Sequence, residues 1–335
     1  MTKIEEQIGQ TKVKSVVVGV WKGQNEVLTL ALGESMSMVP STKDMHIRIG
    51  GVTETFQGTL LMMLVEQGHL KLDDKISKWL PDLLSADEVT VEMLIKNTAG
   101  YKDYVLNDAF VNLITNQPFR EITREEIIEY SVGDGKMNFP PGTKQAYSHT
   151  EFTILGEVME RATEKTMKQL YEENIFKPMG LKNTGYISTP ELPLPVMHVF
   201  SKDRGVYEDA TYWNPSWTGE SGSLYSNLAD LGRWGYIFGK GQLISPESFE
   251  NLVGRYENYG REDLYFASGF VVANGWYLQN PSFNGYSGAF GFQPDGDYTV
   301  VVYSSISEDS PEGTVAFNIY KELIKIVTPD KPVNF

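Results

Sequence analysis

The side chains that could carry out catalysis are limited in this 335-residue chain, because it contains no cysteine and only four histidines. The absence of cysteine excludes thiolate nucleophiles, cysteine-bound zinc and iron–sulfur clusters. His46, His69 and His198 show no spacing that is typical of metal ligands. Glu54 and His149 could approach each other, but two ligands are fewer than the three or four that a zinc site needs. We therefore expect no metal site and no cofactor.

Serine is the remaining common nucleophile, but its local sequence motifs are absent. The chain contains no Gly-x-Ser-x-Gly elbow and no phosphate-binding loop. Ser148, Ser221 and Ser226 are the candidate hydroxyls. Ser226 precedes a segment with helical periodicity and is predicted to be its N-cap, and Ser221 lies in a glycine-rich turn. These interpretations disfavour both as nucleophiles.

The elements that would position such residues fall into three blocks along the chain. The first fifty residues predict a β-hairpin with its turn at Gln24–Asn25. Apolar spacing then predicts a series of helices, at about 56–65, 90–95, 125–130, 152–163, 167–173 and 228–239. The last hundred residues return to strands, at 265–272, 275–278 and 298–305. They end in an amphipathic helix whose apolar stripe is predicted to contain Val315, Ile319, Leu323 and Ile326.

This order predicts an α/β (α+β) fold rather than a doubly wound parallel sheet. We expect an antiparallel sheet built from both chain ends and flanked by helices, with an inserted, mostly helical domain. Residues 1–50 plus 220–335 would form the sheet domain, and residues 51–219 would form the helical domain. Binding sites in such proteins tend to lie between domains. The cleft between the two parts is therefore the expected site.

Charge and hydropathy restrict the partners. The chain has 29 Lys and Arg against 44 Asp and Glu, a net charge of −15, which disfavours binding to nucleic acid or to an anionic membrane. No apolar run approaches the roughly 20 residues of a membrane span. Residues 1–14 are polar and mixed in charge, unlike a secretory leader. We expect a soluble, cytoplasmic protein whose partner is a small-molecule substrate or ligand.

Several blocks of sequence resemble the serine β-lactamase and penicillin-binding-protein superfamily. The similarity is greatest to its branch of class C β-lactamases, D-alanyl-D-alanine carboxypeptidases and esterases. The blocks occur in family order over nearly the whole chain, at residues 47–56, 90–100, 139–142, 147–149, 173–185, 221–226 and 285–289. This resemblance implies the β-lactamase/transpeptidase-like fold.

The resemblance also identifies three motifs in which this chain differs from the family pattern. Gly51 and Glu54 stand where the family has the serine nucleophile and the lysine of Ser-x-x-Lys. Tyr147-Ser148-His149 corresponds to Tyr-x-Asn, and the tyrosine is retained. Glycine has no side chain, so an acyl-enzyme cannot form at position 51.

The third motif lies near the C-terminus. Tyr286, Ser287 and Gly288 correspond to the Lys-Thr-Gly or His-Thr-Gly of the family and are the expected substrate-binding residues. The resemblance further implies an oxyanion hole formed by the backbone N–H groups of Gly51 and Ala289. Backbone donors survive a change of side chain as long as the elements that carry them keep their places.

Two interpretations of Glu54 remain open. In an interfacial pocket it could be a general acid or base with a raised pKa, and the missing side chain of Gly51 would leave room for water or substrate. Alternatively, Glu54 could only neutralise a nearby cation such as Arg48 in an inactive site. Tyr147 and His149 would relay protons in the first interpretation, whereas His149 could also be a structural histidine and Tyr286 could merely fill space.

The two interpretations of Glu54 lead to two hypotheses for the function. The first is a reprogrammed acid/base enzyme with Glu54, Tyr147 and His149 as catalytic residues. It would hydrolyse a small amide, ester or lactone without a covalent intermediate, or abstract a proton as an isomerase or lyase. The second is a catalytically inert relative that binds a small ligand or a protein partner in the cleft.

Overall fold

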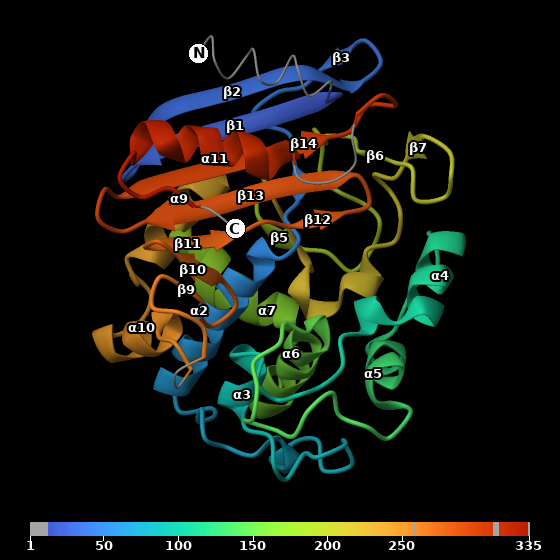
Figure 1. Cartoon of the computed structure of the whole chain (residues 1–335), viewed down its shortest axis with the longest axis vertical. Helices are drawn as coiled ribbons and strands as arrows, with labels where there is room; N and C mark the ends of the chain where they lie inside the picture. The colour runs from blue at the N-terminus through green and yellow to red at the C-terminus, as the bar shows by residue number, and fades with distance from the viewer. Residues whose placement is uncertain (1–12, 257–258, 311–314, 334–335) are drawn as a thin grey trace.

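A computed structural model describes residues 13–256, 259–310 and 315–333 of the chain. Its largest element is a sheet of nine strands in which every neighbouring pair is antiparallel (Figure 1). The strand order is β3-β2-β1-β14-β13-β11-β10-β9, and β12 pairs with β13. The bounds are β1 Ser15–Lys22, β2 Asn25–Met36, β3 Val39–Pro40, β9 Leu264–Phe266, β10 Val271–Ala273, β11 Trp276–Gln279, β12 Ser282–Phe283, β13 Tyr286–Gln293 and β14 Tyr298–Ser305.

Both ends of the chain contribute to the centre of this sheet, where β1 pairs with β14. Both faces of β1 are covered at this position, and this explains why its sequence is rich in valine. Val16 and Val18 belong to one apolar cluster, whereas Val17 belongs to the cluster on the opposite face. A single continuous apolar run therefore specifies an internal strand.

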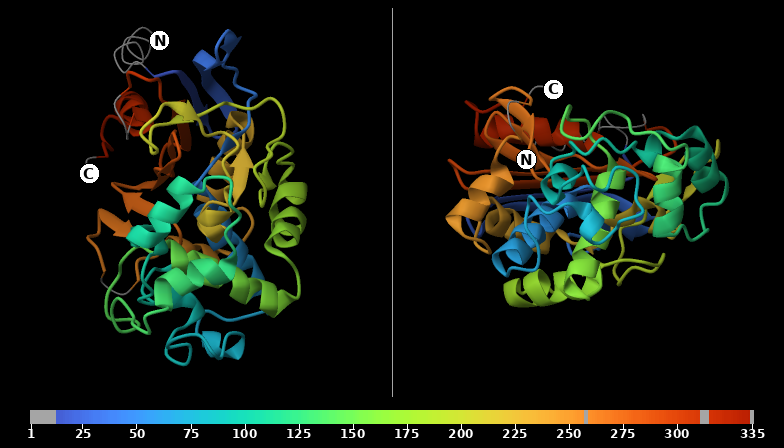
Figure 2. Two further views of the ribbon diagram at one scale, coloured as in Figure 1. Left: turned by 90° about the vertical axis from the view of Figure 1, so that its right-hand side faces the viewer. Right: turned by 90° about the horizontal axis from the view of Figure 1, so that it is seen from below.

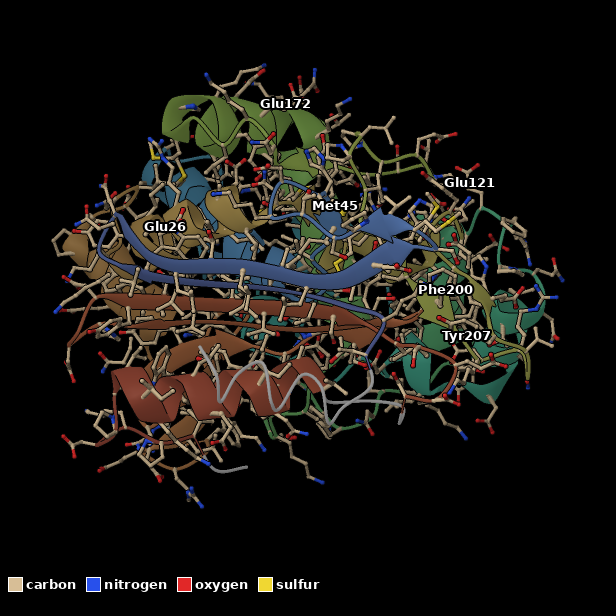
Figure 3. All side chains as sticks on the ribbon, turned by 90° about the horizontal axis from the view of Figure 1, so that it is seen from above. Glu26, Met45, Glu121, Glu172, Phe200 and Tyr207 are labelled. Atoms are coloured by element: carbon tan, nitrogen blue, oxygen red, sulfur yellow. The ribbon has the colours of Figure 1, made fainter. Side chains whose placement is uncertain are left out.

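Helices cover the two faces of the sheet (Figure 3). One face carries α11 (Val315–Val327), which contacts β13 and β14, and the other carries α9 (Leu228–Gly239), which contacts β1 and β14. In Figure 3 the labelled Glu172 lies on the side opposite α11. The apolar stripe that was predicted for α11 is buried at Val315, Ile319 and Leu323, whereas its fourth member, Ile326, is 63% exposed.

Most of the remaining helices gather beside the sheet, as the blue to green segments of Figure 2 show. Their bounds are α2 Val52–Glu66, α3 Val91–Ile95, α4 Asp108–Asn116, α5 Arg124–Val132, α6 His149–Thr163, α7 Met167–Tyr171, α8 Lys177–Met179 and α10 Pro246–Val253. Short helical turns add η1 Ile76–Lys78, η2 Tyr104–Leu106, η3 Glu172–Phe176 and η4 Ser216–Ser221. The predicted fold class is confirmed, whereas the domain boundaries at residues 51 and 220 stay a prediction.

Helix α2 runs through the interior, and all but three of its fifteen residues are buried. Phe56 stacks on Trp234 of α9 with ring centroids 3.8 Å apart, and the Trp234 indole N–H donates to Thr55 Oγ1 at 2.8 Å. A helix buried on all sides needs polar partners for each polar side chain that it carries. The first turn of α2 is therefore held in the centre of the molecule.

Two smaller sheets complete the fold. β4 (Ile47–Arg48) and β5 (Gly185–Tyr186) pair with β8 (Leu224–Ser226), and β6 (Phe200–Ser201) pairs with β7 (Glu208–Asp209). Ser226 is not the N-cap of α9, as was expected. It is the last residue of β8, and Asn227 caps the helix by accepting from the Asp230 N–H.

Other strand boundaries also differ from expectation. The turn between β1 and β2 is at Gly23–Gln24, one residue earlier than predicted, because Gly23 adopts φ +59°. The strand predicted at 265–272 is two strands, β9 and β10, because Gly269 at φ +86° reverses the chain between them. In the part of the chain that the structure describes, no helix is long and apolar enough to cross a membrane.

Candidate functional site

The site is built around the first turn of α2. Strand β4 leads into Gly50, which adopts φ +52°, and Gly51 then occupies the N-cap position. Glu54 follows in the first turn and is 0% exposed. The Gly51 N–H has no hydrogen-bond partner within the described residues. The same turn thus offers a free backbone donor and a buried carboxyl group.

Two uncharged side chains hold the Glu54 carboxyl. The Tyr147 hydroxyl is hydrogen-bonded to Oε1, and Gln279 Nε2 donates to Oε2 at 2.9 Å. Arg48 is not a partner, because its Nη2 donates to the carbonyls of Pro190, Thr211 and Trp213 at 2.9, 3.1 and 3.2 Å. The alternative that Glu54 neutralises Arg48 is therefore wrong.

The environment of Glu54 favours the neutral acid. Burial raises the pKa of Glu54 well above its usual range, against hydrogen bonds from Tyr147 and Gln279 that lower it. Because Oε2 accepts from Gln279, the acidic hydrogen of the neutral form lies on Oε1, next to the oxygen of Tyr147. Glu54 can then donate to that oxygen, which frees the hydrogen of the Tyr147 hydroxyl for another acceptor.

Gln279 was missed by the sequence analysis. It is the last residue of β11, and its Nε2 also donates to the Gly269 carbonyl at 2.8 Å. Its Oε1 lies 2.9 Å from the position that a Cβ on Gly51 would take. The expected space for water or substrate beside Gly51 is therefore partly filled by this amide. A polar residue at the end of an apolar strand was the available signal.

His149 forms a pair with Asp103, which the sequence analysis also missed. Nδ1 of His149 lies 2.9 Å from Asp103 Oδ2 and 3.1 Å from Oδ1. Asp103 is fixed in turn as the N-cap of η2, where its Oδ1 accepts from the Val105 N–H at 3.3 Å. The rings of Tyr147 and His149 meet edge to face at 4.7 Å between centroids. With Nδ1 engaged, Nε2 is the nitrogen left for a ligand.

These groups lie along one cavity of about 420 Å³, called the site cavity below. Gly51, Tyr147, His149 and Gln279 line it, together with two further aromatic side chains, Trp217 and Phe266. Tyr147 is 41% exposed, so it connects the sealed Glu54 carboxyl with the cavity. A cavity that brings titratable groups together is the default candidate for an active site.

The third sequence motif lies elsewhere in the structure. Tyr286, Ser287, Gly288 and Ala289 all belong to β13, which is internal to the sheet. Tyr286 is 3% exposed and packs near Arg48, and Ser287 Oγ accepts from the Ala316 N–H at 3.3 Å. None of the four lines the site cavity. Tyr286 and Ser287 line a neighbouring cavity instead.

The expected pair of backbone donors is likewise not brought together. The Gly288 N–H donates to the Pro281 carbonyl at 2.8 Å. Successive N–H groups of a strand point to opposite sides, so the Ala289 N–H is directed at β14, where Ala289 pairs with Val302. Gly51 lines the site cavity, but the Ala289 N–H is not there as a second donor.

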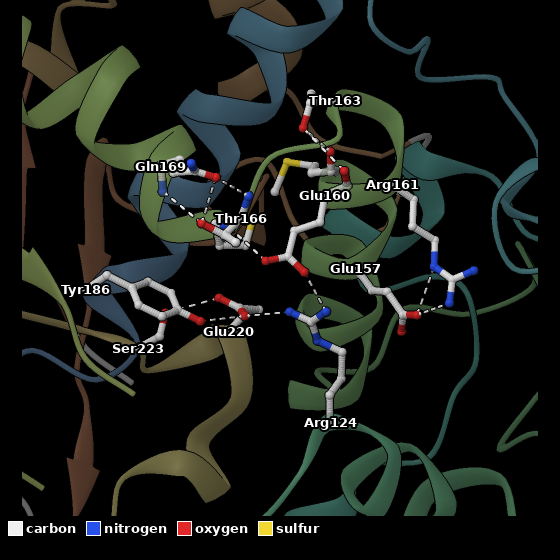
Figure 4. A network of polar contacts seen from close by, with 12 residues as sticks. Arg124, Glu157, Glu160, Arg161, Thr163, Thr166, Gln169, Tyr186, Glu220 and Ser223 are labelled. Carbon is white, nitrogen blue, oxygen red and sulfur yellow. Dashed lines mark hydrogen bonds and ion pairs between the residues drawn. The ribbon is translucent and has the colours of Figure 1, made fainter. Parts of the chain in front are cut away.

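Another part of the cavity wall is η4, from which Trp217 and Ser221 line the cavity. A buried network fixes this turn (Figure 4). Arg124 of α5 donates to Glu160 of α6 at 2.7 Å and to Glu220 of η4 at 3.0 Å. Burial raises the pKa of Glu220, and the charge of Arg124 opposes this rise.

Two further contacts complete the attachment of η4. The Tyr186 hydroxyl donates to Glu220 Oε1 at 2.9 Å, and Ser223 Oγ donates to Oε2 at 3.2 Å. Gly156 of α6 allows the close approach, because a Cβ there would lie 2.4 Å from Cγ of Glu220. The cavity wall is thus tied to the helix that begins with His149.

Among the other candidate residues, Ser221, Ser226 and His198 have structural partners. Ser221 Oγ donates to the Thr218 carbonyl at 2.6 Å, and Ser226 Oγ lies 2.8 Å from Thr184 Oγ1. Ser148 is 1% exposed and does not line the site cavity. His198 contacts Asp209 at 2.7 Å. Among residues with a described position, no group of three His, Asp or Glu side chains could hold a metal ion.

Comparison with solved structures identifies similar folds. A D-stereospecific amidohydrolase from Streptomyces sp. matches with a TM-score of 0.82 at 22% identity, covering 91% of this chain and 94% of that one. A D-amino acid amidase from Ochrobactrum anthropi SV3 matches with a TM-score of 0.80 at 19% identity, covering 98% and 99%. At these identities the likeness shows the fold alone.

Sequence relatives include a carboxypeptidase/endopeptidase and a putative penicillin-binding protein. The D-alanyl-D-alanine-carboxypeptidase/endopeptidase AmpH of Escherichia coli (strain K12) is 28% identical over 197 residues, which are 57% of this chain and 48% of that protein. The putative penicillin-binding protein PbpX of Bacillus subtilis (strain 168) is 23% identical over 282 residues, which are 82% and 66%. The chain therefore spans about half to two thirds of the length of these relatives.

A family model described as Beta-lactamase matches residues 1–322. This match includes the large antiparallel sheet, helix α2 and nearly all of the elements that surround the site cavity. The chain belongs to the beta-lactamase family.

Proposed function

We propose that this protein hydrolyses a small amide or ester by direct attack of water, without an acyl-serine intermediate. The observation that carries the proposal is the position of Tyr147. Its hydroxyl contacts the buried acid Glu54, its ring contacts His149, and its exposed part lines the site cavity. A proton donor and a proton acceptor thus meet at one surface of the cavity.

In the proposed reaction, His149 activates the water. Nε2 takes a proton from the water, and the resulting hydroxide attacks the carbonyl carbon of the substrate. Asp103 holds the Nδ1–H and stabilises the imidazolium that forms. The Gly51 N–H donates to the carbonyl oxygen, on which negative charge develops.

The leaving group then receives a proton from Tyr147. The carbon–nitrogen or carbon–oxygen bond breaks, the Tyr147 hydroxyl gives its proton to the departing atom, and Glu54 returns a proton to Tyr147. The proton that His149 took from water passes back to Glu54 through Tyr147. The net change is the addition of one water across the scissile bond, and every side chain ends in its starting state.

Two kinds of evidence support this proposal. Gly51 cannot be acylated, so a covalent route at that position is closed. The fold is shared with proteins named D-stereospecific amidohydrolase and D-amino acid amidase, which makes amide hydrolysis a natural chemistry for this scaffold. An enzyme of this kind should also hydrolyse activated esters, because an ester has the better leaving group.

The test is a screen of amides and activated esters with the unaltered protein, H149Q and E54Q. We expect turnover by the unaltered protein and a loss of about 10²–10⁴-fold in kcat for each variant. Hydrolysis in ¹⁸O-labelled water should place one label in the acid product in a single turnover. Fluorescent penicillin should leave no covalent label. Unchanged kcat in both variants, or a stable penicillin adduct, would overturn the mechanism.

A second candidate is an inert protein that binds a ligand in the same cavity. It is favoured by one observation, the complete burial of Glu54 beneath Gln279 and Tyr147. This alternative predicts ligand binding without turnover, and affinities that are the same in E54Q and in the unaltered protein.

A further inference from the structure

We infer that the site cavity selects uncharged ligands that carry an aromatic ring, and discriminates against both carboxylates and amines. This inference deepens the proposed function, because it assigns the chemical class of the group that the cavity receives. Three observations carry it: the absence of charged residues from the lining, the position of the nearest ionic groups outside that lining, and the aromatic walls.

The first observation is that the lining is uncharged. In a chain with a net charge of −15, none of the residues that line the described cavity is Asp, Glu, Lys or Arg. Its polar members, besides Tyr147 and His149, are hydroxyl and amide side chains such as Thr218, Gln279 and Asn280. These groups can orient a carbonyl but cannot neutralise a full charge.

The second observation is that the nearest ionic groups do not line the site cavity. Arg48 is 3% exposed, and its Nη2 is directed at three backbone carbonyls. Asp103 is occupied by His149. Lys202, which lines the neighbouring cavity, donates to the Ser310 carbonyl at 3.1 Å. Asp203 lines the neighbouring cavity as well, and neither it nor Lys202 lines the site cavity, so no Asp, Glu, Lys or Arg of the described lining can meet a charged ligand there.

The third observation is that aromatic side chains form two walls. Tyr147 meets Phe266 edge to face at 5.7 Å between centroids, and both line the cavity. Trp217, on η4, lines the cavity as well. Faces and edges of such rings favour contact with another ring. They also attract a cation, but no carboxylate in the described lining supports one, and Glu54 is 0% exposed and does not line the cavity.

The energetic consequence follows from desolvation. A carboxylate or ammonium that enters the cavity loses water and gains no counter-ion, which is costly. An uncharged carbonyl loses less and can accept from the Gly51 N–H. Affinity should therefore fall when charge of either sign is placed on the same framework.

The test compares three probes of similar size by isothermal titration calorimetry. Benzylacetone is neutral, hydrocinnamate is an anion and phenylpropylamine is a cation. We expect benzylacetone to bind at least about tenfold more tightly than either charged probe. Sodium chloride at about 1 M shortens the Debye length to about 3 Å, so that the net charge of the protein does not set the order.

Two variants at Ser282 provide a matched control. Ser282 is exposed at the edge of the cavity and has no part in the proposed chemistry. S282K should strengthen hydrocinnamate binding and S282D should strengthen phenylpropylamine binding, while benzylacetone binding changes by less than about twofold. The aromatic walls are tested with the cyclohexyl analogue of benzylacetone, which should bind more weakly than benzylacetone.

Equal or tighter binding of hydrocinnamate or phenylpropylamine to the unaltered protein would overturn the inference, as would tighter binding of the cyclohexyl analogue. Benzylacetone contains no bond that water can hydrolyse, so its affinity is independent of turnover. A protein that prefers benzylacetone but hydrolyses nothing would contradict the proposed function and leave this inference standing. A protein that hydrolyses amides or esters but prefers the charged probes would support the proposed function and contradict this inference.

Discussion

Gln279 and Gly51 face each other across the site, and the amide oxygen of Gln279 lies 2.9 Å from the point where a Cβ on Gly51 would be. The same amide donates its Nε2 hydrogen to Glu54 at 2.9 Å. One side chain therefore closes the space beside Gly51 and fixes the carboxyl group one turn further along α2. Position 51, which has no side chain, and Glu54 are therefore linked through the Gln279 amide.

This relationship makes a prediction for Gly51→Ser. A Cβ at 2.9 Å from an amide oxygen is too close, but Gln279 can shift because its amide is at the end of a flexible side chain. We expect G51S to fold with a loss of about 1–3 kcal/mol in the free energy of unfolding, measured by urea denaturation. G51S/Q279A should recover part of this loss. Equal destabilisation in both variants would show that Gln279 is not the obstacle.

The same variant tests whether a serine at position 51 restores covalent chemistry. Burial raises the pKa of Glu54 and so disfavours the carboxylate that could act as a base for the new hydroxyl, and G51S should therefore remain unlabelled by fluorescent penicillin, as read on a denaturing gel. Labelling of G51S would show that another group deprotonates the serine, and would contradict the neutral state of Glu54.

Glu54 should also make stability depend on pH. Its pKa is raised in the folded protein by burial, above the unfolded value of about 4.3. Its contribution is therefore complete below the unfolded pKa and is lost as the pH rises through the folded pKa. The loss can reach about 1.4 kcal/mol for each unit of pH in that window.

The variant E54Q isolates this effect, since a glutamine can keep both hydrogen bonds but has no proton to lose. We expect the stability difference, E54Q minus the unaltered protein, to increase as the pH rises from about 4.3, when urea denaturation is repeated across the pH range. Q279A is the comparison, because it removes a hydrogen bond but keeps the titration. Parallel pH profiles for E54Q and the unaltered protein would mean that Glu54 is already ionised.

The Asp103–His149 pair predicts a separate effect on the reaction. Asp103→Asn would place an amide against Nδ1 and favour the wrong tautomer of His149, so kcat should fall by about 10²–10⁴-fold with little change in KM. H149Q should lose a similar amount, and the double variant should lose no more than either single one. Independent, multiplying losses would show that the two residues do not act as a unit.

The fold could be predicted largely from local patterns, because an internal strand and an amphipathic helix each carry their own periodicity. The valine run of β1 and the apolar stripe of α11 are of this kind. The boundary at Ser226 failed for a reason of tertiary structure. Its hydroxyl bonds to Thr184, and Asn227 can take the capping position.

The site was predicted only in part. Tyr147 and Glu54 meet as expected, since a sequence motif marked each. No sequence motif identifies Gln279 or Asp103, because their roles depend on the register of β11 and on the turn at η2. Ala289 could not be placed either, since the direction of a strand N–H changes with every residue.

The network beneath η4 makes the last prediction. Arg124 is the only described ion-pair partner of Glu220, whose side chain is 4% exposed. Arg124→Met leaves this carboxylate buried without a cation, and should lower the free energy of unfolding by about 2–4 kcal/mol.

The double variant R124M/E220Q should be more stable than R124M, because the glutamine carries no charge and its carbonyl oxygen can accept from one of the Tyr186 and Ser223 hydroxyls while its NH2 group donates to the other. Trp217 lies on the same turn, so benzylacetone affinity should fall in R124M and return in the double variant. Stability is read from urea denaturation and affinity from calorimetry. If R124M weakens folding but leaves the affinity unchanged, the network stabilises the fold without positioning the cavity wall.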